Sequence, residues 1–122
     1  MKNNSMFNRV EKKVASMSPT ELRLTCQLAE RELDMRRSCW VHEMYGQFSD
    51  MERIGMAYAI RGATPDDRWA HDRIIVNCFT DKNRSKVTAG MSRLSPGDFF
   101  DYHTGVAIAF ARAVGEPVPD LF

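Results

Sequence analysis

Arg73-Ile74-Ile75-Val76-Asn77-Cys78-Phe79-Thr80 is a run of β-branched and aromatic residues, and this composition favours a β-strand. Asp81-Lys82-Asn83-Arg84, which comes next, has the composition of a turn. Residues 85–94 then alternate as a returning strand does, with Val87, Ala89 and Met91 on one face and Lys86, Thr88, Gly90 and Ser92 on the other. Together the three segments predict an antiparallel hairpin.

The segment before this hairpin has two interpretations. Apolar side chains alternate with small or charged ones over residues 52–61, which is the strand period. Ser49 and Glu52 have instead the spacing of a helix capping box. We favour the strand, because three antiparallel strands are more stable than an isolated pair.

An alanine-rich helix is predicted after the hairpin. A turn at residues 95–98 leads to Asp101, which has the position of an N-cap. Gly115 is placed to end the helix in a left-handed conformation, and Pro117 follows it. Because small side chains permit close packing, we expect this helix to lie on the sheet.

Two helices are predicted ahead of the sheet. The first runs from about Met6 to Ser16 and ends before Pro19. The second begins with Ser18 as N-cap and Glu21 as its capping-box partner, and it extends to roughly Gly46. A helix of this size is about 40 Å long, which exceeds the needs of a small globule. We therefore expect a homodimer that forms through this long helix.

These elements predict an α+β fold with two N-terminal helices, a small antiparallel sheet of two or three strands, and a C-terminal helix packed on the sheet. A chain of 122 residues has room for one domain, residues 1–122. Within it we expect a helical part at 6–48, a sheet and helix module at 52–115, and an extended tail at 116–122.

The composition limits which cellular compartment and which class of partner we expect. The net charge of +1 does not indicate nucleic acid, but 12 of the 17 cationic residues are Arg, which favours interface roles. No apolar run is long enough for a membrane span or a secretion signal. The three cysteines, Cys26, Cys39 and Cys78, form no C-x-x-C pair, so we expect reduced thiols and a cytoplasmic location.

Catalytic and metal-binding motifs are not found in the sequence. Cys39 and His42 have the i,i+3 spacing of metal ligands, but zinc needs four ligands, so neither a metal site nor a cofactor is expected. The cysteines lie in apolar stretches and are expected to be buried and inert. A turn and a helix cap account for Asp98 and Asp101. The chain is therefore predicted not to be an enzyme.

Two surfaces are candidate binding sites. The long helix carries arginines and aromatic residues typical of protein interfaces, namely Arg36, Arg37, Trp40, Tyr45 and Phe48, although the aromatic residues could equally cap the sheet. The hairpin carries cations that could hold phosphates, namely Arg73, Lys82, Arg84, Lys86 and Arg93. A DNA-binding regulator that uses hairpin 81–86 is therefore the alternative function. No aromatic residues interleave with these cations, so a base-stacking platform is not indicated.

The last third of the chain has a recognisable pattern. Residues 95–101, followed by residues 105–112, resemble a module of small phage and prophage proteins, in which a strand leads into a P-x-D-x-F-D turn and a G-x-A-x-A helix. The matching residues are Pro96, Asp98, Phe100, Asp101, Gly105, Ala107 and Ala109. The resemblance covers residues 73–115 and implies a mobile-element context without any chemistry. We therefore expect a non-enzymatic accessory protein that binds and modulates a host or phage protein, for example by inhibiting a defence or regulatory factor.

Overall fold

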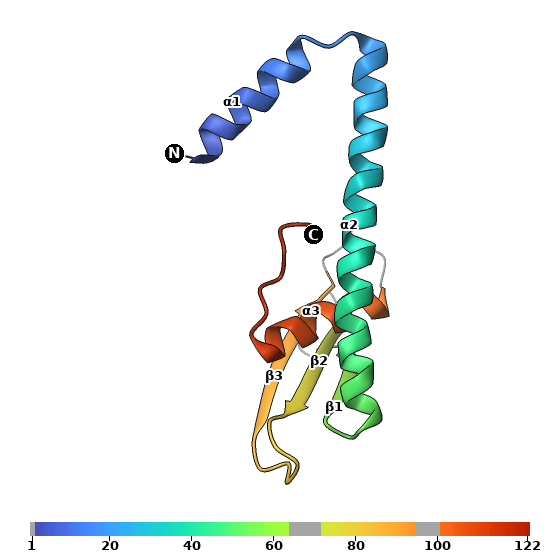
Figure 1. Cartoon of the computed structure of the whole chain (residues 1–122), viewed down its shortest axis with the longest axis vertical. Coiled ribbons are helices and arrows are strands. Elements are labelled where there is room, and N and C mark those ends of the chain that lie inside the picture. The colour runs from blue at the N-terminus through green and yellow to red at the C-terminus, as the bar shows by residue number, and fades with distance from the viewer. Residues whose placement is uncertain (1, 64–71, 95–100) are drawn as a thin grey trace. The chain divides into compact units, whose positions relative to one another are not determined.

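The computed structural model describes residues 2–63, 72–94 and 101–122 (Figure 1). Its elements in chain order are α1 (Lys2–Ala15), α2 (Pro19–Arg53), β1 (Ala57–Ala63), β2 (Asp72–Phe79), β3 (Val87–Arg93) and α3 (Tyr102–Val114). The three strands form one antiparallel sheet in the order β1-β2-β3. The predicted α+β fold is confirmed, including the long second helix and the C-terminal helix packed on the sheet.

The chain divides into two compact units, Met1–Arg36 and Arg37–Phe122. The division lies inside α2 and not between residues 48 and 52, where the sequence predicted a subdivision of one domain. α1 begins at Lys2, earlier than the predicted Met6. No described helix, including the 35-residue α2, has an apolar stretch that could cross a membrane.

α2 continues beyond its predicted end near Gly46 and reaches Arg53, so that prediction is wrong. A glycine inside a helix costs about 1 kcal/mol relative to alanine. Met44 and Phe48, one on each side of Gly46, are both buried, and burying side chains of this size stabilises by about 2 kcal/mol each. Core packing therefore outweighs the local preference of Gly46 to end the helix.

The ambiguous segment 52–61 is divided between two elements. Residues 52–53 belong to α2 and the strand begins only at Ala57, so neither the predicted strand start nor the capping box at Ser49 is correct. α2 ends at Arg53, and Gly55, whose φ of 77° is left-handed, follows in the closing turn, where Met56 N donates to Met51 O at 2.8 Å. This is the usual glycine-based termination of a helix.

The other predicted helix caps are confirmed. Ser18 and Glu21 exchange backbone-to-side-chain hydrogen bonds of 3.2 Å each at the start of α2. Asp101 accepts from His103 N at 3.2 Å, and Gly115 ends α3 with a φ of 79°. The turn predicted at residues 95–98 lies outside the described residues.

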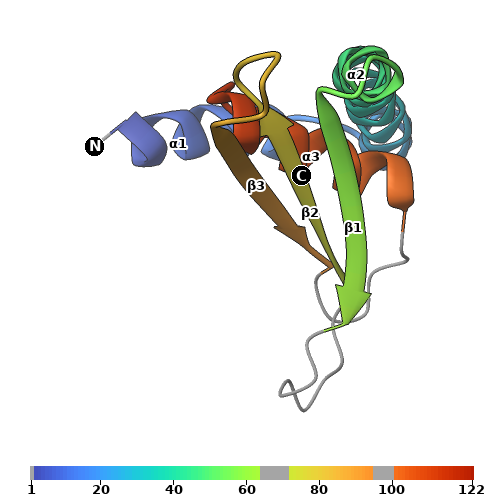
Figure 2. The same ribbon diagram turned by 90° about the horizontal axis from the view of Figure 1, so that it is seen from below.

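The hydrophobic core lies between one face of the sheet and the helices of the second unit. α3 lies across that face and contacts α2 through Phe48 and Phe110, whose ring centroids are 6.1 Å apart (Figure 2). The buried apolar residues are Met44, Phe48, Ala57, Ile74, Val76, Cys78, Val106, Ala107, Ala109, Phe110, Ala111 and Ala113. All of them belong to the second unit.

α3 approaches β3 closely at Gly90. A Cβ atom on Gly90 would lie 2.1 Å from Ala109 O and 2.4 Å from Ala113 N, both backbone atoms of α3. The neighbouring inward residue on β3, Ser92, is also small, and its Oγ donates to Gly105 O at 2.7 Å. β3 therefore contacts α3 through glycine and serine, and its larger apolar side chains are on the opposite face.

The first unit has no core of its own. Every side chain whose burial is described between residues 4 and 36 is exposed, apart from the half-buried Met17. The large exposed side chains are Met6, Phe7, Val10 and Val14 of α1 and Leu22, Leu24, Leu28, Leu33 and Met35 of α2. Most of the stability of a helix in a protein comes from the packing of its apolar face, and short isolated helices are marginally stable in water. The exposed apolar stripes of this unit lack such packing.

Gly90→Ala is expected to destabilise the protein strongly, because the new methyl group overlaps the α3 backbone and forces the helix away from the sheet. Overpacking typically costs about 1–3 kcal/mol, and a clash with backbone atoms places this variant at the upper end. Gly62→Ala on β1 is the matched control, since no described atom lies within 4 Å of its Cβ position. Urea unfolding of both variants measures the difference. Equal stabilities would show that α3 does not lie against Gly90.

Asp101→Ala is expected to lower stability by about 1 kcal/mol, the usual cost of losing an N-cap. Asp101 accepts hydrogen bonds from His103 N and from Thr104 Oγ1, and alanine accepts neither. Asp101→Asn keeps an acceptor and should retain most of the stability. The measurement is again the urea midpoint, and a loss in Asp101→Asn as large as in Asp101→Ala would contradict the capping role.

Candidate functional site

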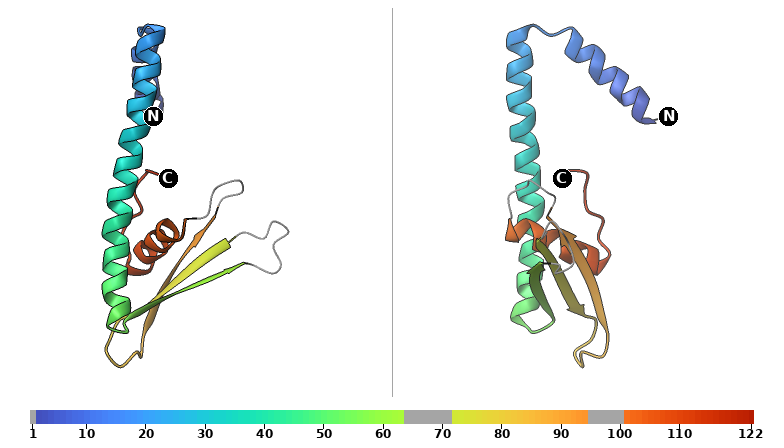
Figure 3. Two further views of the ribbon diagram at one scale, coloured as in Figure 1. Left: turned by 90° about the vertical axis from the view of Figure 1, so that its right-hand side faces the viewer. Right: turned by 180° about the vertical axis from the view of Figure 1, so that it is seen from behind.

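The aromatic residues of α2 that were predicted to form an interface pack against other residues of the second unit. Phe48 is only 1% exposed and therefore does not reach the surface. Tyr45 packs edge-on against His103, with ring centroids 4.5 Å apart, and against Tyr102. Trp40 packs edge-on against Phe122, at 5.5 Å. These contacts join α3 and the C-terminal tail to α2, and Figure 3 shows the course of these segments.

The two arginines of the same predicted interface have different environments. Arg36 is exposed and forms an i,i+4 ion pair with Glu32, with Nε and Oε1 3.4 Å apart. Exposed pairs of this kind contribute less than about 1 kcal/mol. Arg37 is half-buried, and its Nε donates to Leu121 O in the C-terminal tail. Of the five predicted interface residues, Arg36 is therefore the one that is exposed, and the other four are half-buried or buried.

The cysteines are not uniformly buried, contrary to the prediction. Cys26 and Cys39 are exposed free thiols, whereas Cys78 is a core residue of β2. Burial raises the pKa of the Cys78 thiol, which keeps it protonated and unreactive at neutral pH. Within the described ranges, no three His, Cys, Asp or Glu side chains are grouped in a way that could bind a metal ion.

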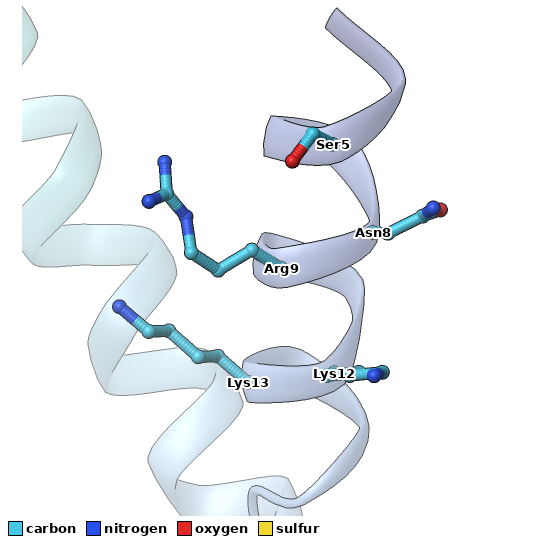
Figure 4. Close-up of a pocket in the computed structure, with 5 residues that line it drawn as sticks. All are labelled: Ser5, Asn8, Arg9, Lys12 and Lys13. Carbon is cyan, nitrogen blue, oxygen red and sulfur yellow. The ribbon is translucent and has the colours of Figure 1, made fainter. Parts of the chain in front are cut away.

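A shallow hollow on α1 is lined by polar side chains, namely Ser5, Asn8, Arg9, Lys12 and Lys13 (Figure 4). All five belong to one helix and all five are exposed. A small-molecule site usually encloses its ligand between several elements. We assign no ligand to this hollow.

The five cations of the predicted nucleic-acid site form two separate groups. Arg73 on β2 lies directly opposite Arg93 on β3, at one end of the sheet. The other three, Lys82, Arg84 and Lys86, lie in the connection beyond Phe79, at the other end. A strand rises about 3.3 Å per residue, so positions 73 and 79 are about 20 Å apart. The sheet does not bring these cations together into one patch.

One cation of the hairpin already packs within the protein. The guanidinium carbon of Arg84 lies 5.3 Å from the centre of the Phe79 ring, a cation–π geometry. Its Nη2 atom also lies 2.8 Å from the position where a Cβ on Gly55 would be. Arg84 therefore covers part of Phe79 and the end of α2, and among the predicted cations of the hairpin connection this leaves Lys82 and Lys86 for other contacts.

The face of the sheet opposite α3 is another candidate surface, which the sequence did not predict. Within the second unit, neither α3 nor the end of α2 covers this face (Figures 2 and 3). We call it the open face, and its residues are Tyr58, Ile60, Gly62, Arg73, Ile75, Asn77, Phe79, Val87, Ala89, Met91 and Arg93. Antiparallel sheets with one solvated face usually have polar side chains there. Here most of the side chains are apolar.

The apolar side chains of the open face are contiguous. The strand register places Ile60, Ile75 and Met91 side by side in one row across all three strands. Tyr58 lies in the next row, beside Asn77, and its ring packs against Phe79 of the row beyond, with ring centroids 5.9 Å apart. The exposed fractions are 43% for Tyr58, 51% for Ile60, 49% for Val87 and 40% for Met91. Contiguous exposed apolar surface of this kind marks interaction sites in soluble proteins.

Two signals in the sequence could have identified the open face. β2 is apolar on both sides, since Ile74 and Val76 face α3 while Ile75 and Phe79 face the other way. Glycine inside a strand often marks the close approach of another backbone, and Gly90 of β3 is such a glycine. Because Gly90 faces α3, its neighbours Ala89 and Met91 must face outward. The alternation of β3 was predicted, but not which of its faces is covered.

Comparison with known proteins identifies no relative of this chain. No protein-family model, no curated protein and no solved structure matches the chain. Two surfaces of the described chain remain candidates for binding: the apolar stripes of the first unit and the open face of the sheet.

Proposed function

We propose that this chain is a non-enzymatic accessory protein of phage or prophage type, which acts in the cytoplasm by binding another protein and modulating it. The mobile-element context comes from the resemblance of residues 73–115 alone. Free cysteines, two of them exposed, suit a reducing compartment. The observation that carries the binding role is the amount of apolar surface that the fold leaves exposed on both units.

The proposal includes a homodimer that forms through the first unit. Leu22, Cys26, Ala29 and Leu33 on α2 are separated by four, three and four residues, which is the spacing of a coiled-coil seam. All four side chains are exposed in the described part of the chain. A second copy offers the same stripe, so pairing buries both at once and supplies the core that the first unit lacks.

The dimer is tested by changing the stripe. The wild-type chain has a mass of 14.0 kDa, so light scattering is expected to give about twice this value. Leu22→Glu with Leu33→Glu places charges in the seam and is expected to give the monomer mass. Ile54→Glu, at a position 72% exposed in the second unit, is the matched control and should remain dimeric. A monomeric wild-type protein at micromolar concentration would contradict the dimer.

Cysteine reactivity provides an independent test of the same interface. Cys26 lies in the seam and Cys39 lies in the second unit, and both thiols are exposed in the single chain. We expect an alkylating reagent to modify Cys26 about tenfold more slowly than Cys39 in the dimer, because burial limits access to a thiol. The two rates should become similar in the variant Leu22→Glu with Leu33→Glu. Equal rates in the wild-type protein would argue against this seam.

Modulation of another protein is tested by affinity capture from a host lysate, followed by mass spectrometry. The proposal expects a specific partner in near-stoichiometric amount. Recovery of the chain's own second copy and nothing else, with folded protein as bait, would contradict the accessory role. That outcome would not contradict the proposed homodimer.

A further inference from the structure

The open face carries arginines but no carboxylate among its described residues. Arg73 and Arg93 are direct cross-strand neighbours at one end of it. Like charges in this position destabilise a sheet unless an anion lies near both. Asp72 is next to Arg73 in sequence, but it pairs with Arg61, with Oδ2 and Nη2 3.0 Å apart. The positive end of the open face is therefore left for a group from outside the sheet.

We propose that the open face is a docking surface for a protein partner whose own surface has an apolar centre and carboxylates at one edge. The inference rests on the proposed function in one respect, that the partner is a protein. The apolar row Ile60, Ile75 and Met91 contacts the partner's apolar centre. Arg73 and Arg93 pair with its carboxylates. An apolar core with arginines at the rim is the usual anatomy of a protein interface.

Charge argues against a second copy of this chain as the occupant. Two open faces packed against each other would bring together surfaces whose described residues include arginine and no acid. Neither copy could neutralise the other, and burying an unpaired guanidinium costs several kcal/mol. The homodimer therefore uses the first unit, and the open face stays available in each copy.

The centre of the open face argues against single-stranded nucleic acid. Such strands bind by stacking their bases on aromatic rings. Ile60, Ile75 and Met91 offer no ring, and Tyr58 and Phe79 are the two rings on the face. Phe79 is half-buried, and Arg84 already lies over its ring at 5.3 Å. An aliphatic centre suits apolar side chains of a protein better than it suits bases.

The test selects random short peptides from a display library on the immobilised full chain. Peptides bound by the wild-type protein are expected to be enriched in Asp and Glu together with apolar residues, relative to the unselected library. Ile60→Ser with Met91→Ser is expected to weaken the selected peptides by about tenfold or more, since interface anchors commonly contribute over 1 kcal/mol each. Both positions are at least 40% exposed, so the fold should tolerate serine there.

The matched control is Ile54→Ser with Val114→Ser, two exposed apolar residues outside the open face. It should bind the selected peptides as the wild-type protein does. A new selection on Arg73→Glu with Arg93→Glu should enrich Lys and Arg in place of acids. Peptides with no acidic bias, or peptides that bind the serine variant unchanged, would overturn the proposal.

Two further arms separate this proposal from its alternatives. A labelled random-sequence single-stranded oligonucleotide that binds the wild-type protein but not the serine variant would assign the open face to nucleic acid and overturn the protein partner. The monomeric variant Leu22→Glu with Leu33→Glu should bind the selected peptides normally. Failure of the dimer and failure of the open face therefore give different results.

Discussion

The architecture of the second unit depends on one close contact, between the backbone of β3 at Gly90 and the backbone of α3 near Ala109. The alanines of α3 and the glycine of β3 remove the side chains that would separate a helix from a sheet. The separation between β3 and α3 is therefore small, and the hydroxyl of Ser92 donates a hydrogen bond to Gly105 O across it. The core is filled by Ile74 and Val76 of the central strand and by side chains of the two helices.

This contact determines which face of β3 is exposed. With Gly90 and Ser92 turned toward α3, the strand must direct Ala89 and Met91 to the other side. The central strand contributes Ile75 and Phe79 to that side as well. Most antiparallel sheets bury their apolar face and solvate the polar one. Here the strand that contacts α3 most closely buries its small residues, so the larger apolar ones form a surface.

The sequence predicted most of the architecture, because its signals were local. The hairpin, the capping box at Ser18 and the termination at Gly115 each depend on a few adjacent residues. The end of α2 could not be predicted in this way. Gly46 disfavours helix locally, and only the burial of Phe48 against Phe110, which is distant in sequence, extends the helix to Arg53.

The candidate site was less predictable, because it depends on tertiary packing. The aromatic residues of α2 have the composition of an interface, but the C-terminal tail and α3 cover them. The cations of the hairpin are close in sequence but occupy opposite ends of a strand pair. The open face combines residues from three strands, and only their register shows that Ile60 and Met91 lie on either side of Ile75.

The cross-strand pair of Arg73 and Arg93 has a consequence for the colloidal behaviour of the free protein. An exposed apolar sheet face favours stacking of one molecule on another, and two guanidinium groups at its end oppose this by repulsion. Salt weakens that repulsion, since the Debye length falls from about 10 Å at 0.1 M to about 3 Å at 1 M. The same salt does not weaken apolar attraction, and sulfate strengthens it. The unbound protein therefore remains dispersed most readily at low ionic strength.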